Sequence, residues 1–226
     1  MCHAACIDFV RQRLHLEEVK GREVLEVGAL NVNGSVRPLV CALQPGRYIG
    51  VDIKSGRDVD EICDASELVQ HFGRSSFDLL ISTEMLEHVR DWRKVISEFK
   101  HVLRPGGLLV ITTRSLGFPY HAFPDDFWRY EQSDLEKIFS DFDCEAIESD
   151  PSAPGVFLKA RKPKDFVMYK PDSHALFSMI TRRRVVTLTD AQLAAFRRRG
   201  KWQQIIRAPE WLVRRWRRKL QSQFQN

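Results

Sequence analysis

The stretch Glu23-Val24-Leu25-Glu26-Val27-Gly28-Ala29-Leu30-Asn31-Val32-Asn33-Gly34 decides the fold. It opens with an apolar run of strand length that ends at a glycine, passes through an Asn-rich turn, and leads into residues 35–40, which can begin a helix. Gly28 lacks a side chain, and Asn31 and Asn33 tolerate positive φ. This order predicts a site for a nucleotide-like ligand at the carboxyl end of the strand. Taken alone, the segment fits an ordinary turn equally well.

The composition fits one α/β domain with an extension, or two small domains. The chain has 226 residues, of which 43% are hydrophobic, so a substantial core is expected. No apolar run reaches the roughly 18 residues that a membrane-spanning helix needs. The first residues lack the basic and apolar regions of a signal peptide, and we therefore expect a cytoplasmic protein.

The cysteines form a scattered set of five without a CxxC pair, which argues against a disulfide framework or a zinc knuckle. Cys2 and Cys6 lie near His3 in the sequence and could in principle touch a metal. The pattern is too weak to predict one, and we expect no metal site.

The net charge of +5 hides an asymmetry along the chain. Residues 1–175 hold 22 Lys and Arg against 28 Asp and Glu, whereas residues 176–226 hold 13 against 2. A mildly acidic body with a basic tail indicates that the tail meets an anionic surface, such as a membrane, a nucleic acid or an acidic partner.

The first half of the chain alternates short apolar runs with segments of helical character. The clearest buried strand is Phe77 to Ser82, and Asp91 is placed to cap the helix after it. Leu103-Arg104-Pro105-Gly106-Gly107 reads as the end of that helix. The alternation predicts a parallel, doubly wound α/β sheet. The expected strands are 23–27, 48–52, 59–64, 77–82 and 108–113, and the expected helices include 4–20, 66–72 and 91–99.

Asp52 ends the second expected strand, 24 residues after Gly28. Folds that bind dinucleotides place at about this distance a carboxylate that accepts hydrogen bonds from a ribose diol. The alternative is an ordinary aspartate in a turn at the end of a strand.

Six motifs together resemble the class I, Rossmann-like S-adenosylmethionine-dependent methyltransferases, in particular small bacterial members. The motifs keep the family's order over about residues 20–163. They are Val24-Leu25-Glu26-Val27-Gly28, Gly50-Val51-Asp52, Cys63-Asp64-Ala65, Phe77-Asp78-Leu79-Leu80-Ile81-Ser82, Glu84-Met85-Leu86-Glu87-His88-Val89 and Leu103-Arg104-Pro105-Gly106-Gly107-Leu108-Leu109.

The resemblance implies a seven-stranded, mostly parallel sheet with helices on both faces and an antiparallel last strand. Residues 144–149 and 155–161 would form its final hairpin. A methyltransferase domain would then occupy residues 1–163, and residues 164–226 would form a basic, partly helical extension.

The resemblance also implies the cofactor S-adenosylmethionine and a set of residues around it. Glu26 and Gly28 would lie near its methionine part, Asp52 would hold the ribose hydroxyls, and Asp64 and Ala65 would meet the adenine. Asn31 and Ile53 would also contact the cofactor. Leu30 replaces the family's usual second glycine. The space that lets the cofactor approach the loop would therefore come from Gly28, Asn31, Asn33 or Gly34. Ser82, Thr83 and Glu84 would line the face where the methyl group is transferred.

The loop from Gly117 to Tyr130 is dense in aromatic, acidic and imidazole groups, which is typical of a substrate lid. An oxygen or nitrogen acceptor must lose a proton, so a nearby base helps methyl transfer. His121 is the first candidate, followed by Asp125, Asp126 and His88. Each of these residues also has a structural alternative: packing over the sheet end, capping a helix, or, for His88, a core position.

The tail contains two basic segments. Residues 190–199 predict a capped helix ending in arginines. In residues 209–224, Leu212, Trp216, Leu220 and Phe224 recur every four residues among arginines, which is typical of a helix lying in a membrane interface. Docking on its own domain or on a second subunit, as in a homodimer, fits equally well, and nucleic-acid binding is supported by charge alone.

Two functions remain open from the sequence. The first is methyl transfer to an oxygen or nitrogen of a small-molecule, glycan or lipid-linked acceptor at the inner membrane face. The second is a catalytically silent cofactor-binding module recruited by its basic tail. A nicotinamide oxidoreductase is disfavoured because the first loop lacks GxGxxG.

Overall fold

The computed structural model describes residues 3–122 and 125–206. The chain divides into two compact units, one up to Thr187 and one from Leu188 onward. The expected domain end at residue 163 lies inside the first unit. Residues 164–187 remain with the sheet domain because they supply strands that pair with a strand from its loop.

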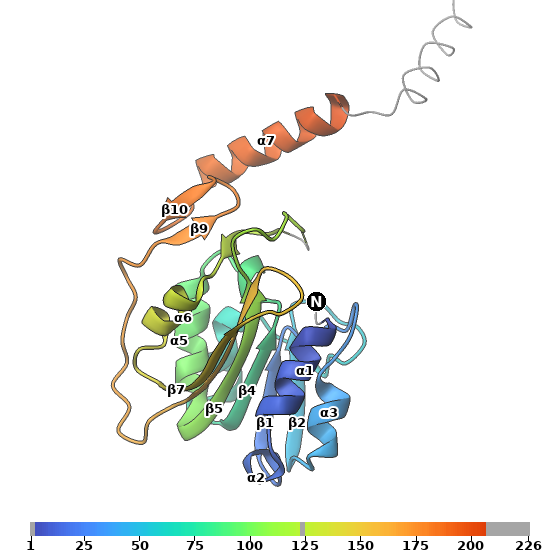
Figure 1. The fold of residues 1–226 in the computed structure, drawn as a ribbon, viewed down its shortest axis with the longest axis vertical. Helices are drawn as coiled ribbons and strands as arrows, with labels where there is room; N and C mark the ends of the chain where they lie inside the picture. The colour runs from blue at the N-terminus through green and yellow to red at the C-terminus, as the bar shows by residue number, and fades with distance from the viewer. Residues whose placement is uncertain (1–2, 123–124, 207–226) are drawn as a thin grey trace, which may run out of the picture. The chain divides into compact units, whose positions relative to one another are not determined.

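A seven-stranded sheet in the order β3-β2-β1-β4-β5-β8-β7 forms the body of the first unit (Figure 1). All neighbours from β3 to β5 pair in parallel, and β8 lies antiparallel between β5 and β7. The seven-stranded doubly wound sheet and its final hairpin are therefore confirmed. The strands are β1 (Glu23–Val27), β2 (Arg47–Asp52), β3 (Glu61–Ile62), β4 (Phe77–Thr83), β5 (Leu103–Arg114), β7 (Asp143–Ser149) and β8 (Gly155–Arg161).

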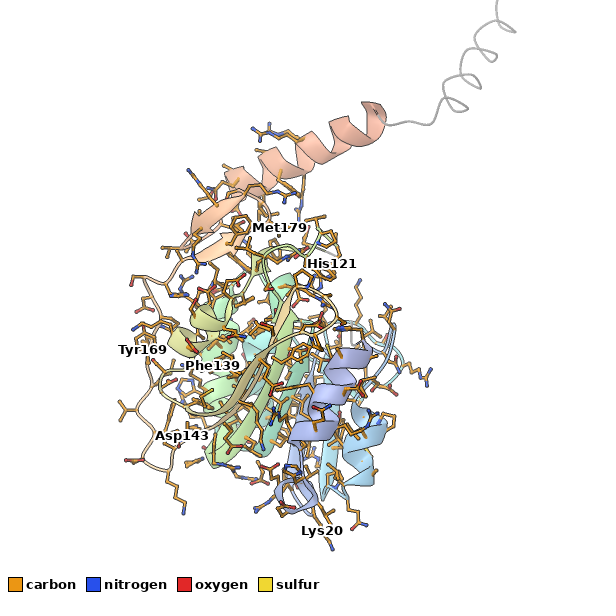
Figure 2. The ribbon with its side chains drawn as sticks, viewed as in Figure 1. Lys20, His121, Phe139, Asp143, Tyr169 and Met179 are labelled. Carbon is orange, nitrogen blue, oxygen red and sulfur yellow. The ribbon has the colours of Figure 1, made fainter. Side chains whose placement is uncertain are left out.

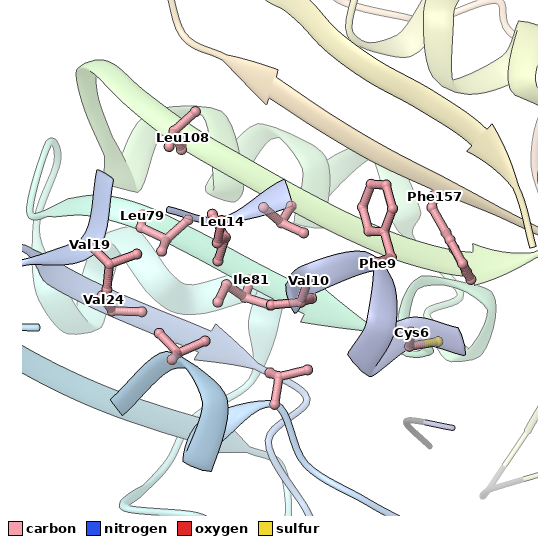
Figure 3. Close-up of a cluster of buried hydrophobic side chains, with 13 residues drawn as sticks. Cys6, Phe9, Val10, Leu14, Val19, Val24, Leu79, Ile81, Leu108 and Phe157 are labelled. Carbon is pink, nitrogen blue, oxygen red and sulfur yellow. The ribbon is translucent and has the colours of Figure 1, made fainter. Parts of the chain in front are cut away.

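Helices cover both faces of this sheet (Figure 1). On one face, α1 (Ala4–Arg13) and α3 (Arg37–Ala42) pack on β1, β4 and β5 through a cluster of buried apolar side chains (Figure 3). On the other lies α5 (Trp92–Val102), which Asp91 caps by accepting a hydrogen bond from the Lys94 N–H at 3.2 Å. The remaining helices of this unit are α2 (Leu16–Val19), η1 (Ala65–Glu67), α4 (Leu68–Phe72), η2 (Leu86–His88) and α6 (Gln132–Ile138).

The first helix ends earlier than its apolar spacing predicts. The expected helix over residues 4–20 is two helices, since the backbone at Leu14 is extended, with φ −105° and ψ 131°. Leu14 joins the core cluster, and His15 then caps α2 through reciprocal hydrogen bonds with Glu18. Burial of Leu14 and the new cap account for the break.

Two other boundaries also differ from expectation. The third strand is only Glu61–Ile62, because Asp64 turns to cap η1 by accepting a hydrogen bond from the Ser66 N–H at 2.8 Å. The Pro-Gly-Gly stretch expected to end a helix is part of β5, with a register shift between Phe77 and Leu79 on the neighbouring strand.

A second, three-stranded sheet lies at the carboxyl end of the first. It pairs β6 (Trp128–Arg129) with β9 (Leu176–Ser178), and β9 with β10 (Arg183–Val185). The extension expected from residue 164 onward to be partly helical therefore begins with two strands, β9 and β10. Trp128 Nε1 donates to the Val89 carbonyl at 2.9 Å and so anchors β6 to the turn after β4.

The second unit begins with α7 (Asp190–Ile206), which confirms the helix predicted from residue 190 and extends it. Its cap is Thr189, whose N–H donates to Gln192 Oε1 at 2.9 Å while its Oγ1 accepts from the Gln192 N–H at 3.3 Å. Among the described residues, no helix is long and apolar enough to cross a bilayer. The predicted helix over residues 209–224 lies outside them.

Candidate functional site

A cavity of about 340 Å³ opens where β1, β2 and β4 end. Parallel strands bring their carboxyl ends to one edge of a sheet, so residues far apart in the chain meet there. Of the expected site residues, seven line the cavity: Gly28, Asp52, Ile53, Asp64, Ala65, Glu84 and His88.

Gly28 leaves space for a ligand, but its backbone N–H is not free to bind one. Its φ is +83°, and an added Cβ would come within 2.7 Å of Met85 Cγ. The N–H groups of Gly28 and Ala29 both donate to the Val51 carbonyl, at 2.9 and 3.0 Å. The glycine is therefore required by both its backbone conformation and its close neighbour.

Asp52 directs its carboxylate into the turn after β1. Its Oδ2 accepts from the Leu30 N–H at 3.3 Å, and its Oδ1 from the Lys54 N–H at 3.1 Å. Each carboxylate oxygen can accept a further hydrogen bond, so this cavity residue retains acceptor capacity for a ligand. Ile53, 54% exposed, adds an apolar surface beside it.

Glu84 directly follows β4 with a φ of +53°, a conformation that few residues other than glycine adopt. Its N–H donates to the Thr112 carbonyl at 2.8 Å, and its carboxylate forms a buried ion pair with Arg114. These contacts hold the strained backbone beside the cavity and keep the Glu84 carboxylate buried against Arg114.

Four residues expected around the cofactor do not line the cavity. Glu26 is buried under β2, where Tyr48 Oη donates to it at 2.6 Å, and burial raises its pKa to about 7. Asn31 holds the turn by donating to Asp58 at 2.7 Å and accepting from the Gly34 N–H. The other two, Ser82 and Thr83, are buried in β4.

The expected catalytic residues belong to a second group next to the cavity, at the end of the sheet opposite Lys20 (Figure 2). The His88 and His121 rings meet edge to face with centroids 4.8 Å apart, and His88 also lines the cavity. His121 Nδ1 lies 3.1 Å from Asp126 Oδ2. Asp125 contributes its backbone carbonyl, which accepts from His88 Nδ1 at 2.6 Å. In the same loop, Phe123 and Pro124 lie outside the described residues.

Glu87 and Arg129 complete this group and were not singled out from the sequence. Glu87 is fully buried, and Thr113 Oγ1 donates to its Oε2 at 2.8 Å. Arg129 forms a two-point contact with Asp126. The sequence signal for Glu87 was its place directly before His88, three residues after another carboxylate.

The charges in this group argue against His121 as a general base at neutral pH. Burial lowers the pKa of His121, but the nearby Asp126 and Glu87 carboxylates outweigh it and raise the pKa to about 9. Burial opposes ionisation of Asp126, yet the Arg129 and His121 contacts lower its pKa to about 2. At neutral pH His121 is therefore an imidazolium, which has no lone pair to accept a proton.

Comparison with known proteins identifies one family model: residues 25–111 match a model described as a methyltransferase domain. The chain is 30% identical over 112 residues to a ubiquinone biosynthesis O-methyltransferase of Idiomarina loihiensis. That alignment covers 44% of this chain and 45% of the relative. The chain thus spans about half the length of the curated relatives it matches.

Two solved structures show how widely the fold is shared. One is a Burkholderia thailandensis 1,6-didemethyltoxoflavin-N1-methyltransferase with bound 1,6-didemethyltoxoflavin and S-adenosylhomocysteine, with TM-score 0.57 and 17% identity over 70% of this chain and 79% of that one. The other is the cyclase SpnF, with TM-score 0.56 and 18% identity over the same shares. At these identities the likeness shows the fold alone.

Proposed function

Because residues 25–111 match a methyltransferase-domain model and lie in a doubly wound, seven-stranded sheet, we propose that this chain is an S-adenosylmethionine-dependent methyltransferase. The observation that carries the proposal is the cavity at the strand ends, where Gly28, Asp52 and Asp64 meet. In this cavity Gly28 leaves space for a ligand, and the Asp52 carboxylate can accept further hydrogen bonds. The turn at Asp64 lies beside apolar lining residues.

In this proposal the cofactor lies across the ends of β1, β2 and β3. The Asp52 carboxylate accepts from the ribose hydroxyls, while Asp64 and Ala65 border the adenine. Gly28 and Glu84 flank the methionine end, and the Glu84 carboxylate contributes indirectly because it is buried and paired with Arg114. The contribution of Glu26 is then indirect, because its carboxylate is held by Tyr48 and does not line the cavity.

Methyl transfer from a sulfonium is an in-line displacement, which a protein accelerates mainly by aligning the acceptor with the methyl group. We place the acceptor beside His88, where the cavity adjoins the His121 loop. The named O-methyltransferase relative supports an oxygen as the methylated atom. A small-molecule, glycan or lipid-linked hydroxyl is the proposed acceptor class.

Calorimetry with S-adenosylmethionine tests the cofactor site. We expect micromolar binding by the wild type and a loss of at least tenfold in Asp52→Ala, the cost of about one charged hydrogen bond. Asp143→Ala, an exposed change on β7, is the matched control and should bind normally. Absence of binding by folded wild type would remove the cofactor assignment.

A second candidate is a cofactor-binding module that transfers no methyl group. It is favoured by the protonated state of His121 and by a fold that a cyclase also adopts. Transfer of a labelled methyl group to hydroxyl-bearing acceptors decides between the two, beginning with phenols, sugars and lipid-linked glycans. Cofactor binding without transfer to any of these would support the silent module.

We also propose that the protein is cytoplasmic and peripheral at the inner membrane face, through residues 209–224. The support is the four-residue apolar repeat among arginines. Sedimentation with anionic liposomes, with and without residues 208–226, tests this. Equal sedimentation of both forms would assign the basic segment to its own domain or to a second copy of the chain.

A further inference from the structure

Three side chains beside the cavity converge on one point. His121 Nε2 lies 3.7 Å and His88 Nε2 3.9 Å from the same carboxylate oxygen, Glu87 Oε1. One ligand atom from each residue lies within 4.8 Å of the others. Two imidazole nitrogens and one carboxylate oxygen face each other at distances too long for good hydrogen bonds.

Glu87 Oε1 has no hydrogen-bond partner among the described residues, although the Glu87 side chain is completely buried. A buried carboxylate oxygen without a donor is costly, and such an atom calls for a group that satisfies it. The space between the three atoms is where that group would lie.

Each of the three side chains is held from its other side. His88 Nδ1 donates to the Asp125 carbonyl at 2.6 Å, and His121 Nδ1 lies 3.1 Å from Asp126 Oδ2. Thr113 Oγ1 donates to Glu87 Oε2 at 2.8 Å. Metal-binding histidines characteristically engage a carbonyl or carboxylate through the second ring nitrogen, which leaves Nε2 for the metal.

We propose that Glu87, His88 and His121 bind a divalent first-row transition-metal ion. The ion displaces a proton from the His121 imidazolium when it binds. Imidazole and carboxylate together favour zinc, iron, cobalt or manganese over calcium and magnesium, which prefer oxygen ligands alone. Bonds of about 2.1 Å place tetrahedral ligand atoms about 3.4 Å apart. The 3.7 and 3.9 Å distances to Glu87 Oε1 therefore need to shorten by only a few tenths of an ångström, and the two imidazole nitrogens lie within 4.8 Å of each other.

The group formed by His3, Cys6 and Glu84 is a poorer cation site, although these residues also lie close together. The Arg114 guanidinium pairs with the Glu84 carboxylate, and its Nη2 lies 3.2 Å from His3 Nδ1. A positive charge already occupies that position. The expectation of no metal site considered only Cys2, His3 and Cys6; Cys2 lies outside the described residues, and the site inferred here uses none of them.

The role of the ion rests on the proposed methyltransferase function. His88 borders the cavity, so an ion with three protein ligands can bind an acceptor hydroxyl in an open position. Binding to the ion lowers the hydroxyl pKa, and its proton leaves to solvent. The oxygen then bonds to the methyl carbon as the carbon–sulfur bond breaks, with its electron pair returning to sulfur. No side chain need act as base.

The test uses the full chain after treatment with a chelator, titrated with Co²⁺ and followed by visible absorption, with Zn²⁺ competition. We expect one Co²⁺ per chain. Glu87→Gln, which retains an acceptor for Thr113, and His121→Gln should each weaken binding on the order of a hundredfold. His71→Asn is the matched control, because His71 and Glu61 form an exposed imidazole–carboxylate pair, and it should bind like the wild type.

Two results would overturn the proposal: no stoichiometric Co²⁺ binding by folded wild type, or binding that His121→Gln leaves unchanged. If Glu87→Gln does not fold, His121→Gln decides, because that imidazole lies on a loop and is 21% exposed. S-adenosylmethionine binding is measured on the same samples. Cofactor binding without metal binding would reject the metal site alone, and metal binding without cofactor binding would reject the proposed function alone.

Discussion

Arg129 forms a bidentate ion pair with Asp126: its Nη1 lies 2.5 Å from Oδ1 and its Nη2 lies 2.7 Å from Oδ2. Both side chains are fully buried. The same guanidinium donates to the Phe118 and Pro119 carbonyls at 3.3 and 2.9 Å. Asp126 in turn accepts from the His121 N–H at 2.9 Å. One buried arginine therefore fixes the path of the loop that carries His121.

Arg129→Met is expected to lower the free energy of unfolding by about 3–5 kcal/mol, because it leaves the Asp126 carboxylate buried without its countercharge. Denaturant unfolding measures this. Arg104→Met is the matched control, since Arg104 pairs with Asp78 at 2.8 Å while 39% exposed, and it should cost less than about 1 kcal/mol. Equal costs for the two variants would contradict the assigned role of Arg129.

Substitutions at Gly28 and Gly106 distinguish the cost of backbone strain from the cost of a steric clash. Their φ values are +83° and +82°, but an added Cβ meets Met85 at Gly28 and nothing within 4 Å at Gly106. Gly106→Ala should cost about 1–2 kcal/mol from the backbone alone. Gly28→Ala should cost more and should also weaken S-adenosylmethionine binding, because Met85 borders the same cavity. Thermal unfolding and calorimetry on both variants test this, and similar losses would show that the Met85 contact is relieved without penalty.

Glu26 makes stability depend on pH in a defined window. Burial raises its pKa from 4.5 to about 7, so the folded protein keeps a proton that the unfolded chain releases between these values. The free energy of unfolding should therefore fall as pH rises from about 4.5 to 7, by up to about 3 kcal/mol from this group. Glu26→Gln can still accept from Tyr48 and should remove that fall. Denaturant unfolding at pH 5 and pH 8 gives the comparison, and parallel changes in both proteins would reject the raised pKa.

Much of the sheet was predictable because its signals are local. Phe77 to Ser82 has four apolar residues in a run of six, and Asp91 stands directly before its helix. The final hairpin was expected only from the family resemblance. Once the strands are parallel, their carboxyl ends must share one edge. For that reason Asp52 could be predicted at the cavity from its position in the sequence, whereas Asp64 was placed there by the family resemblance.

The second group of residues was less predictable because its contacts are long-range. Glu87 and His121 are separated by helix α5, strand β5 and a loop, and no spacing links them. The strands β6 and β9 have two and three residues, too few to show a period of two. Ser82 and Thr83 follow the family pattern, yet they end inside β4 because its last residues stay buried under the loop.

Arg93 ties the segment after the main sheet to α5. Its Nε donates to the Pro171 carbonyl at 3.0 Å, its Nη1 to the Val186 carbonyl at 2.6 Å and its Nη2 to the His174 carbonyl. Its guanidinium also stacks over Trp92, 4.3 Å from the ring centroid. A single side chain therefore satisfies carbonyls at both ends of residues 171–186.

Arg93→Met is expected to loosen this segment while leaving the seven-stranded sheet folded, because the lost hydrogen bonds all go to residues after it. Limited proteolysis should cut the variant within residues 164–187 at least tenfold faster than the wild type, with the far-ultraviolet circular dichroism little changed. Arg90→Met, a change in the turn before α5, is the control and should be cut at the wild-type rate. If Arg93→Met resists cleavage as the wild type does, the pairing of β9 with β6 and the contacts of Tyr169 with Asp141 and of Arg184 with Asp134 are enough to hold the segment.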